Sequence, residues 1–265
     1  MKQEGEEGER FLLFTITDEE GSVIRKIKRS IEAGVQRLVW DFRYSPVVPV
    51  SLQPFDNSVP WHSPDLGYMV APGTYRVSLS KYEDGKLTEL VGPQAFECRP
   101  LNLTSLPPED REALDAFNRK VAKLARAVTA ADAHRANLQE RLPYLEQAIL
   151  SVPALQAEWF ARLSEAKKRL REVHQAINGD PYLSRYEGAS RTSLRNKVDL
   201  ITGALWSTTS GQTATFERAY AEAADGFELL LASLAEADEM IFQLENALEK
   251  AGAPYTPGRF PEWKN

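Results

Sequence analysis

The chain contains little cysteine and little histidine. One cysteine, Cys98, and three histidines occur among 265 residues, so no intrachain disulfide can form. The sequence has no His-x-x-x-His or Cys-x-x-Cys spacing, no glycine-rich phosphate loop and no nucleophile elbow, and these are the usual signatures of zinc sites, nucleotide sites and serine hydrolases. We therefore expect no metal site, no cofactor and no self-contained catalytic site.

Long apolar runs and basic clusters are also missing. No apolar run approaches the roughly 20 residues that a membrane span needs, and a net charge of −6 disfavours nucleic acid, whose phosphates require a clustered basic face. The short run of Arg25, Lys26, Lys28 and Arg29 alternates with isoleucine, which suits a strand edge. Residues 1–10 are charged, lack the apolar core of a signal peptide and are predicted to be disordered.

The first hundred residues have the pattern of β-strands. Apolar and β-branched runs alternate with turn residues, among which Asp84-Gly85 is a strong hairpin signal. The predicted strands cover residues 11–17, 22–31, 35–42, 73–82, 87–90 and 94–98. Several short strands with turns between them favour a β-sandwich over residues 11–101.

One stretch within this half breaks the strand pattern. Residues 44–70 contain five prolines together with Trp61 and His62. Loops of this length in compact domains are often functional. Two interpretations stay open: a loop wrapped over the edge of the sandwich, or a ligand-binding loop that uses Trp61 and His62.

The second half, residues 102–252, has helical periodicity. Pro107-Pro108 followed by two acidic residues is typical of a helix start. Apolar residues then recur at alternating steps of three and four in two long stretches and two shorter ones, listed here: Leu114, Phe117, Val121, Leu124, Val128, Ala131, Leu138, Leu142, Leu145 and Ile149; Trp159, Leu163, Ala166, Leu170, Val173 and Ile177; Leu194, Val198, Ile201 and Leu205; Phe216, Tyr220, Ala223, Phe227, Leu230, Leu234, Ala237, Ile241, Leu244 and Leu248. This period predicts an antiparallel helical bundle with long, coiled-coil-like helices.

Two positions qualify the helical prediction. Arg135 interrupts the first apolar stripe, and Pro143 predicts a kink or a restart, because proline removes one backbone hydrogen bond and clashes with the preceding turn. The stripe continues through Pro143, so the two segments should stay roughly collinear. The sequence leaves open whether part of a stripe faces another chain.

Aromatic residues gather in two further places. Trp206 begins a hydroxyl-rich connection between the third and fourth predicted helices, whose side chains could cap the following helix. The tail, residues 253–265, combines prolines with Tyr255, Phe260 and Trp263. We expect this tail to dock on the protein or on a partner, and the three aromatic residues and Trp206 are candidate contacts.

Several segments together resemble the C-terminal region of bacterial sortilin-like, BNR-repeat propeller proteins, which are often labelled glycosyl hydrolases. In the first half these segments are 21–25, 34–43 and 71–77; in the second half they are 178–180, 206–210 and 253–263. The resemblance covers nearly the whole chain, and it rests on the order and spacing of short motifs.

The resemblance implies an exported protein, periplasmic or on the cell surface, in which a β-propeller precedes this region and any hydrolase site belongs to that propeller. It implies that the sandwich is immunoglobulin-like, as in flagellar hook-capping proteins. Trp40 would then lie in its core, Asp41 and Arg43 would order the following loop, and Gly73 would allow the turn into the strand of Tyr75. It also implies a strand upstream of residue 11, whose absence would expose a sheet edge.

Three functions follow from these observations. The first is a non-catalytic accessory module that packs on a propeller domain of the same protein or on another protein. The second is a carbohydrate-binding module that uses the Trp61 loop. The third is a part of a glycosyl hydrolase.

Overall fold

The computed structural model of the chain describes residues 10–52, 58, 66–152, 156–180 and 193–259. These residues divide into two compact units. The sheet unit comprises residues 1–47, 53–122 and 202–212, and the helical unit comprises residues 48–52, 123–201 and 213–265. The predicted boundary between residues 101 and 102 therefore lies inside the sheet unit, which also includes the beginning of one long helix.

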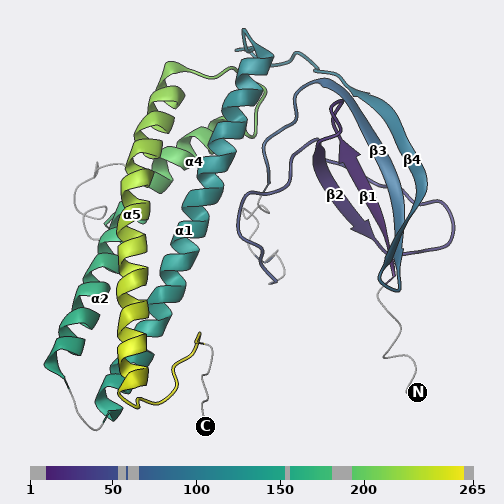
Figure 1. Cartoon of the computed structure of the whole chain (residues 1–265). Helices are drawn as coiled ribbons and strands as arrows, with labels where there is room; N and C mark the ends of the chain where they lie inside the picture. Colours follow the sequence, from purple (N-terminus) through teal and green to yellow (C-terminus); the bar gives the residue numbers. More distant parts are fainter. Residues whose placement is uncertain (1–9, 53–57, 59–65, 153–155, 181–192, 260–265) are drawn as a thin grey trace. The chain divides into compact units, whose positions relative to one another are not determined.

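The sheet unit contains one four-stranded antiparallel sheet (Figure 1). Its strands are β1 (Phe11–Thr17), β2 (Val23–Arg29), β3 (Gly73–Glu83) and β4 (Lys86–Cys98), in the order β2-β1-β3-β4. The predicted hairpin at Asp84-Gly85 is confirmed: both residues have positive φ, 50° and 76°, as a tight two-residue turn between antiparallel strands requires. The sequence therefore predicted β1, β2, β3 and this turn, with strand ends that differ by at most two residues.

Two strand predictions need correction. Residues 87–90 and 94–98 belong to a single strand, β4, because a shift in the β3–β4 register absorbs the residues between them. The predicted strand 35–42 is wrong, since none of these residues belongs to a β-strand. Phe42 has a φ of 56°, and this left-handed conformation ends the extended backbone that a strand needs.

A short ladder replaces the predicted strand. The Tyr44 amide donates to the Tyr68 carbonyl over 3.0 Å, and the Val70 amide donates to the Phe42 carbonyl over 2.9 Å. With the bridge between Arg43 and Met69, residues 42–44 and 68–70 form what we call the loop ladder. The core of the sheet unit contains Ile16, Ile24 and Tyr75 from the sheet and Val70 from this ladder. In the described residues a single sheet carries this core, and the immunoglobulin-like sandwich stays a prediction.

In the part of the chain that the structure describes, four helices follow the sheet: α1 (Arg111–Ser151), α2 (Ala157–Asn178), α4 (Leu194–Leu205) and α5 (Ala214–Lys250). Most residues of the predicted apolar stripes are buried, including every one of the six on α2 and the four on α4. Arg135, which interrupts the α1 stripe, donates to Asp132 one turn earlier over 2.8 Å. α1 continues without interruption through Pro143, so the predicted restart does not occur.

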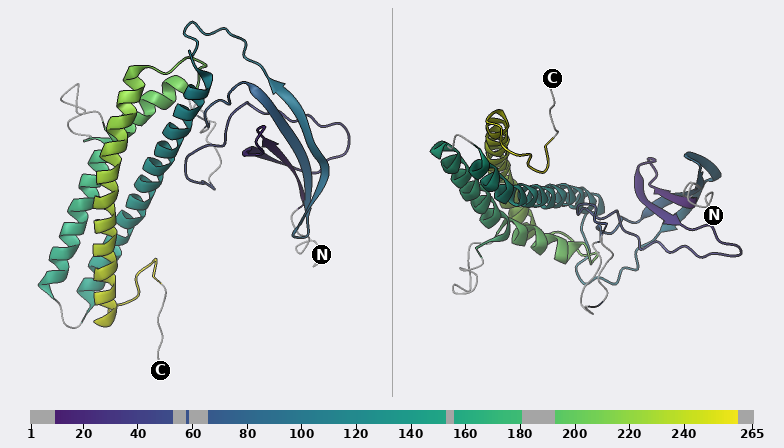
Figure 2. Two further views of the ribbon diagram at one scale, coloured as in Figure 1. Left: turned by 45° about the horizontal axis from the view of Figure 1, so that its top comes forward. Right: turned by 90° about the horizontal axis from the view of Figure 1, so that it is seen from below.

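The directions of the helices differ in part from the prediction. Contacts between α1 and α5 advance together along both helices: His134 lies 3.2 Å from Asp238, and Arg141 pairs with Glu245 one heptad later. α1 and α5 therefore run in the same direction, side by side (Figure 2). The antiparallel prediction holds between α1 and α2, where contacts run in opposite order.

A polar network joins three helices inside the helical unit. The Asp132 carboxylate of α1 accepts hydrogen bonds from Arg135, from Asn178 of α2 over 3.2 Å and from Arg195 of α4 over 2.8 Å. Arg195 also donates to Asn178 Oδ1 over 2.7 Å. Burial acts to raise the pKa of Asp132, but the hydrogen bonds and charges of these partners outweigh it and hold the pKa below its ordinary value.

This network predicts a pH-dependent stability. Because the pKa of Asp132 is lower in the folded than in the unfolded state, its contribution is fully present above the unfolded pKa of about 4 and is lost as pH falls through the folded value. The difference in unfolding free energy between the wild type and Asp132→Asn should therefore shrink as pH falls from 6 toward 2. Urea titrations at several pH values measure this difference, and a gap that stays constant over this range contradicts the assignment.

Candidate protein-docking surface

The structure separates the aromatic candidates that the sequence suggested. Trp61, His62, Phe260 and Trp263 lie outside the described residues. Trp206 belongs to the sheet unit and is buried, with its ring 5.9 Å from that of Tyr68. Tyr255 belongs to the helical unit and is exposed. Among the described residues, these candidates form no common site.

The described part of the tail, residues 253–259, docks on α5. Arg259 donates to the Glu245 carbonyl over 2.7 Å and forms an ion pair with Glu249. Thr256 is buried, and the Tyr255 hydroxyl donates to the Arg259 carbonyl over 3.0 Å. These contacts fasten the chain after α5, as expected for a tail that cannot be helical.

The loop residues that the sequence singled out lie at the loop ladder. The Trp40 indole N–H donates to the Arg43 carbonyl over 3.0 Å, and the Arg43 amide donates to Asp41 Oδ1 over 3.2 Å. The Arg43 guanidinium donates to the carbonyls of Gly67 over 3.0 Å and of Trp206 over 2.5 Å. Arg43 thus ties three separate stretches of the sheet unit together.

Tyr75 and Gly73 lie at the beginning of β3. The Tyr75 hydroxyl donates to the Ala71 carbonyl over 2.6 Å, and burial raises the pKa of this buried phenol. Gly73 does not have a positive φ. A Cβ atom at Gly73 would meet no atom within 4 Å, so the turn into β3 does not depend on glycine.

An apolar trough lies on one face of the sheet, beside the loop that precedes the ladder. Its volume is about 350 Å³, and its lining consists of Ile16, Leu38, Val39, Trp40, Phe42, Val77 and Phe96. Ile16 forms a buried floor, whereas Val39 is 69 % and Phe42 is 43 % exposed. The Trp40 ring packs edge-on against Tyr75 and Phe96, with centroids 5.6 and 6.0 Å apart. The two exposed apolar side chains beside a buried floor make the trough a candidate contact surface.

The chemistry of the trough limits what it can do. None of its seven lining side chains carries a charge, so it offers no acid, base or nucleophile for catalysis. Sequence analysis singled out Trp40 but missed the other lining residues. The sequence did contain a signal for these residues. Leu38, Val39 and Phe42 belong to a run with high β-propensity, and this run pairs with no strand in the described part of the chain.

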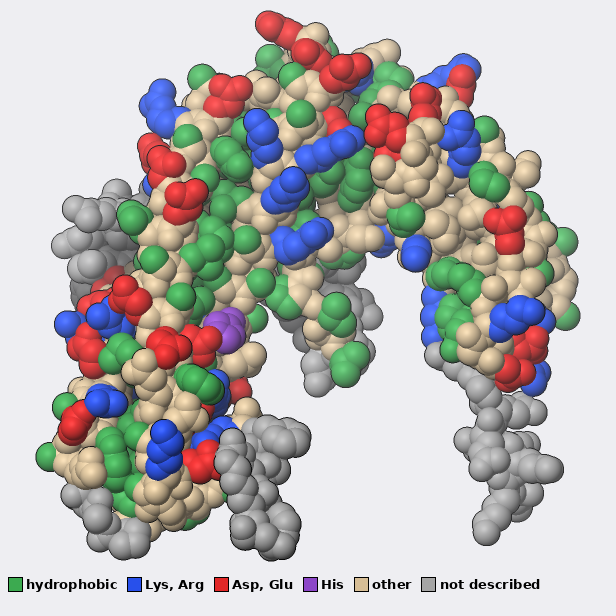
Figure 3. Space-filling model, in the orientation of Figure 1, with side chains coloured by type: hydrophobic (Ala, Val, Ile, Leu, Met, Phe, Trp, Pro, Cys, Tyr) green, Lys and Arg blue, Asp and Glu red, His purple; other side chains and the backbone are tan. Residues whose placement is uncertain are grey.

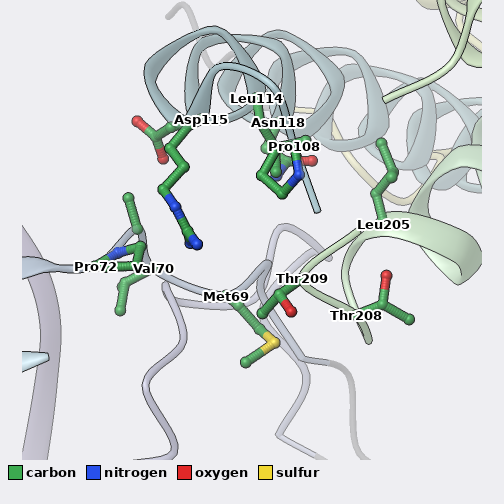
Figure 4. A pocket seen from close by; sticks show the side chains of 12 residues that line it. Met69, Val70, Pro72, Pro108, Leu114, Asp115, Asn118, Leu205, Thr208 and Thr209 are labelled. Atoms are coloured by element: carbon green, nitrogen blue, oxygen red, sulfur yellow. The ribbon is translucent and has the colours of Figure 1, made fainter. Parts of the chain in front are cut away.

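A second hollow in the sheet unit is smaller (Figure 4). Its walls include Met69, Val70, Leu114 and Leu205, and its volume is about 40 Å³. Asn118, only 6 % exposed, also lines it, and its Oδ1 atom has no hydrogen-bond partner among the residues that the structure describes. The hollow holds little more than ordered water, whereas small-molecule sites usually measure about 300–1,000 Å³. The trough is therefore the better candidate site.

Besides Tyr75, three titratable side chains of the sheet unit have raised pKa values. Burial raises the pKa of Tyr44 and Tyr68, whose rings stack with centroids 4.2 Å apart. Burial also raises the pKa of the Cys98 thiol, which makes a thiolate nucleophile less accessible. These groups stabilise the core of the sheet unit and supply no reactive centre.

Basic side chains gather on the N-terminal half of α1 (Figure 3). Arg119, Lys120, Lys123 and Arg126 are exposed there, and Arg119 pairs with Asp115 over 2.8 Å. Sequence analysis overlooked this group. Four cations, one of them paired, are fewer than the roughly six to ten phosphate contacts of a typical nucleic-acid interface, so the group adds no argument for a nucleic-acid partner.

The described ranges contain neither a candidate metal site nor a candidate membrane span. No three histidine, cysteine, aspartate or glutamate side chains of the described residues are arranged to hold a metal ion. In the same part of the chain, no helix combines the length and the apolar character that crossing a bilayer requires. Comparisons of this chain with protein-family models, with curated proteins and with solved structures found no match.

Proposed function

We propose that this chain is a non-catalytic accessory module that packs against another protein domain through the apolar trough of its sheet. The observation that carries this proposal is the partial exposure of the trough. The side chains of Val39 and Phe42 are exposed to solvent, whereas Ile16 beneath them is already buried. Covering these side chains would remove apolar surface from water, which is the main driving force of protein association.

The resemblance of the sequence suggests the partner. Residues 34–43, which contain four of the seven trough residues, are among the segments that resemble propeller-associated C-terminal regions. We propose a β-propeller domain, of the same protein or of another protein, as the partner. The same resemblance supports the immunoglobulin-like assignment of the sheet unit and an exported location. Any hydrolase activity would belong to the propeller.

The proposal predicts that Val39→Asp weakens binding to a separately expressed propeller domain by about 10- to 100-fold. Leaving a buried valine out of an interface costs about 1.5–3 kcal/mol, and a carboxylate in an apolar contact adds a desolvation cost. Titration calorimetry measures the two affinities. Leu229→Asp is the matched control, because Leu229 is also exposed but lies on α5 in the helical unit.

Two results would contradict the proposal. One is the absence of association between the wild type and the propeller domain at high micromolar concentration. The other is equal affinity of Val39→Asp and the wild type. Circular dichroism of each variant checks that the sheet is intact. A loss of affinity in Leu229→Asp alone would show that the interface lies on the helical unit.

A further inference from the structure

We infer that residues 35–41 form an open strand site, at which the partner adds a β-strand to this module. The inference rests on the proposed function and deepens it, because it names how the partner is held. The trough supplies apolar contact, and the open strand site supplies backbone hydrogen bonds. Strand addition of this kind combines main-chain pairing for affinity with side-chain pockets for specificity.

The backbone of residues 35–41 is unpaired. Among the described residues, no backbone N–H or C=O group of Val35–Asp41 forms a hydrogen bond. The pairing begins only at Phe42, whose carbonyl accepts from the Val70 amide. Each backbone group is an obligatory donor or acceptor, so seven consecutive unpaired residues beside an apolar surface form a template for another strand.

The geometry of the loop ladder explains why the chain itself leaves this template open. Arg43 pairs with Met69 in antiparallel fashion, so continued pairing would place Trp40 opposite Pro72. Proline has no amide proton to donate, and the chain enters β3 at the next residue, Gly73. In addition, the left-handed φ of Phe42 turns the backbone of residues 35–41 away from the direction of the ladder. These residues therefore do not continue the pairing that begins at Phe42.

The side chains of the site suit an added strand. Three consecutive residues of the site, Leu38, Val39 and Trp40, line the trough. Leu38 and Trp40 are partly buried, whereas Val39 is 69 % and Val35 is 105 % exposed. β-Branched side chains on an exposed extended segment are stabilised by cross-strand neighbours, which this segment lacks in the described residues.

The uncharged lining of the trough limits which strand can be added. None of the seven lining side chains carries a charge, so a row of carboxylates or ammonium groups would be desolvated there without a partner. The occupant that we assign is an uncharged strand with alternating β-branched residues, contributed by the partner domain.

Hydrogen–deuterium exchange tests the open strand site directly. The probe is an eight-residue peptide of alternating valine and threonine with a lysine at each end, and its control is the same peptide with N-methyl groups on alternate amides. In the free protein, the amides of 35–41 should exchange at least about tenfold faster than those of β1, because they are unpaired. The probe should slow their exchange about tenfold, and the N-methylated peptide should not.

Several outcomes would overturn the inference. These are slow exchange of 35–41 in the free protein, no protection by the probe up to its solubility limit, or protection confined to the outer edges of β2 or β4. A further outcome is protection of 35–41 that rises with protein concentration in the absence of peptide, together with a dimer in light scattering. This outcome would show that the added strand comes from a second copy of the chain, and the assignment to a partner domain would be wrong.

A matched pair of variants separates this inference from the proposed function. Arg37→Pro removes one backbone donor from the site, and Arg37→Ala changes the same exposed side chain but keeps the donor. With the propeller domain as ligand, Arg37→Pro should bind about tenfold more weakly than Arg37→Ala. If Val39→Asp weakens binding and the two Arg37 variants bind equally, the proposed function stands and strand addition is wrong. If Val39→Asp has no effect, the proposed function itself is wrong.

Discussion

Replacing Arg141 by alanine is expected to lower the free energy of unfolding of the helical unit by about 3–5 kcal/mol. The Glu245 side chain is only 2 % exposed, and both of its oxygens accept from the Arg141 guanidinium, at 2.5, 2.6 and 3.1 Å. Among the described residues, Arg141 is the only hydrogen-bond partner of this carboxylate. Removing it would leave a buried charge without compensation, and the helical unit would lose stability.

Urea unfolding followed by circular dichroism measures this loss. Arg162→Ala is the control, because Arg162 pairs with Glu158 on the exposed surface of α2 and such pairs contribute about 0–1 kcal/mol. The double variant Arg141→Met/Glu245→Met should recover most of the stability, since it removes both charges and retains apolar volume. A loss below about 1 kcal/mol in Arg141→Ala would show that Glu245 finds another partner.

The second large effect is expected at Gly67, in the sheet unit. A Cβ atom at this position would lie 2.3 Å from the Tyr44 carbonyl oxygen and 2.7 Å from that of Ser45. Both are backbone atoms, so the clash can be relieved only by moving the loop ladder. Gly67→Ala should therefore cost about 1–3 kcal/mol of stability, the usual range for overpacking, and should weaken partner binding, because the ladder supports the trough.

Exchange of the Tyr44 and Val70 amides reports this change, because these two groups donate the ladder hydrogen bonds. Both should exchange faster in Gly67→Ala than in the wild type. Gly73→Ala is the matched control, since a methyl group there meets no atom within 4 Å and should leave stability within about 0.5 kcal/mol. Unchanged exchange at both amides would mean that the close approach at Gly67 is not needed for the ladder.

The helices and most strands could be predicted from the sequence because their signals are local. A stripe at steps of three and four, as in Leu163, Ala166 and Leu170, identifies the buried face of α2 whatever it packs against. The Asp84-Gly85 turn specifies its hairpin in the same way, since few residues adopt positive φ twice in succession. Fold class and helix limits follow from such signals.

The candidate site could not be predicted from the same signals. Residues 35–42 have the composition of a strand, but a strand exists only when a neighbour pairs with it, and the chain beyond Val70 turns away into β3. The trough depends on that missing pairing, because Val77 and Phe96 come from β3 and β4, far from Trp40 in the sequence. Contacts between distant segments carry no local pattern.

The sequence by itself determined the division into a strand-rich first half and a helical second half, the hairpin at Asp84-Gly85 and the apolar faces of four helices, because propensity and periodicity act over a few neighbouring residues. Only the tertiary structure decided that α1 and α5 run in the same direction and that Glu245 is buried against Arg141. It also decided that residues 35–41 lie beside an apolar trough without a backbone partner among the described residues. These features depend on which distant segments meet, and that is decided by packing over the whole unit.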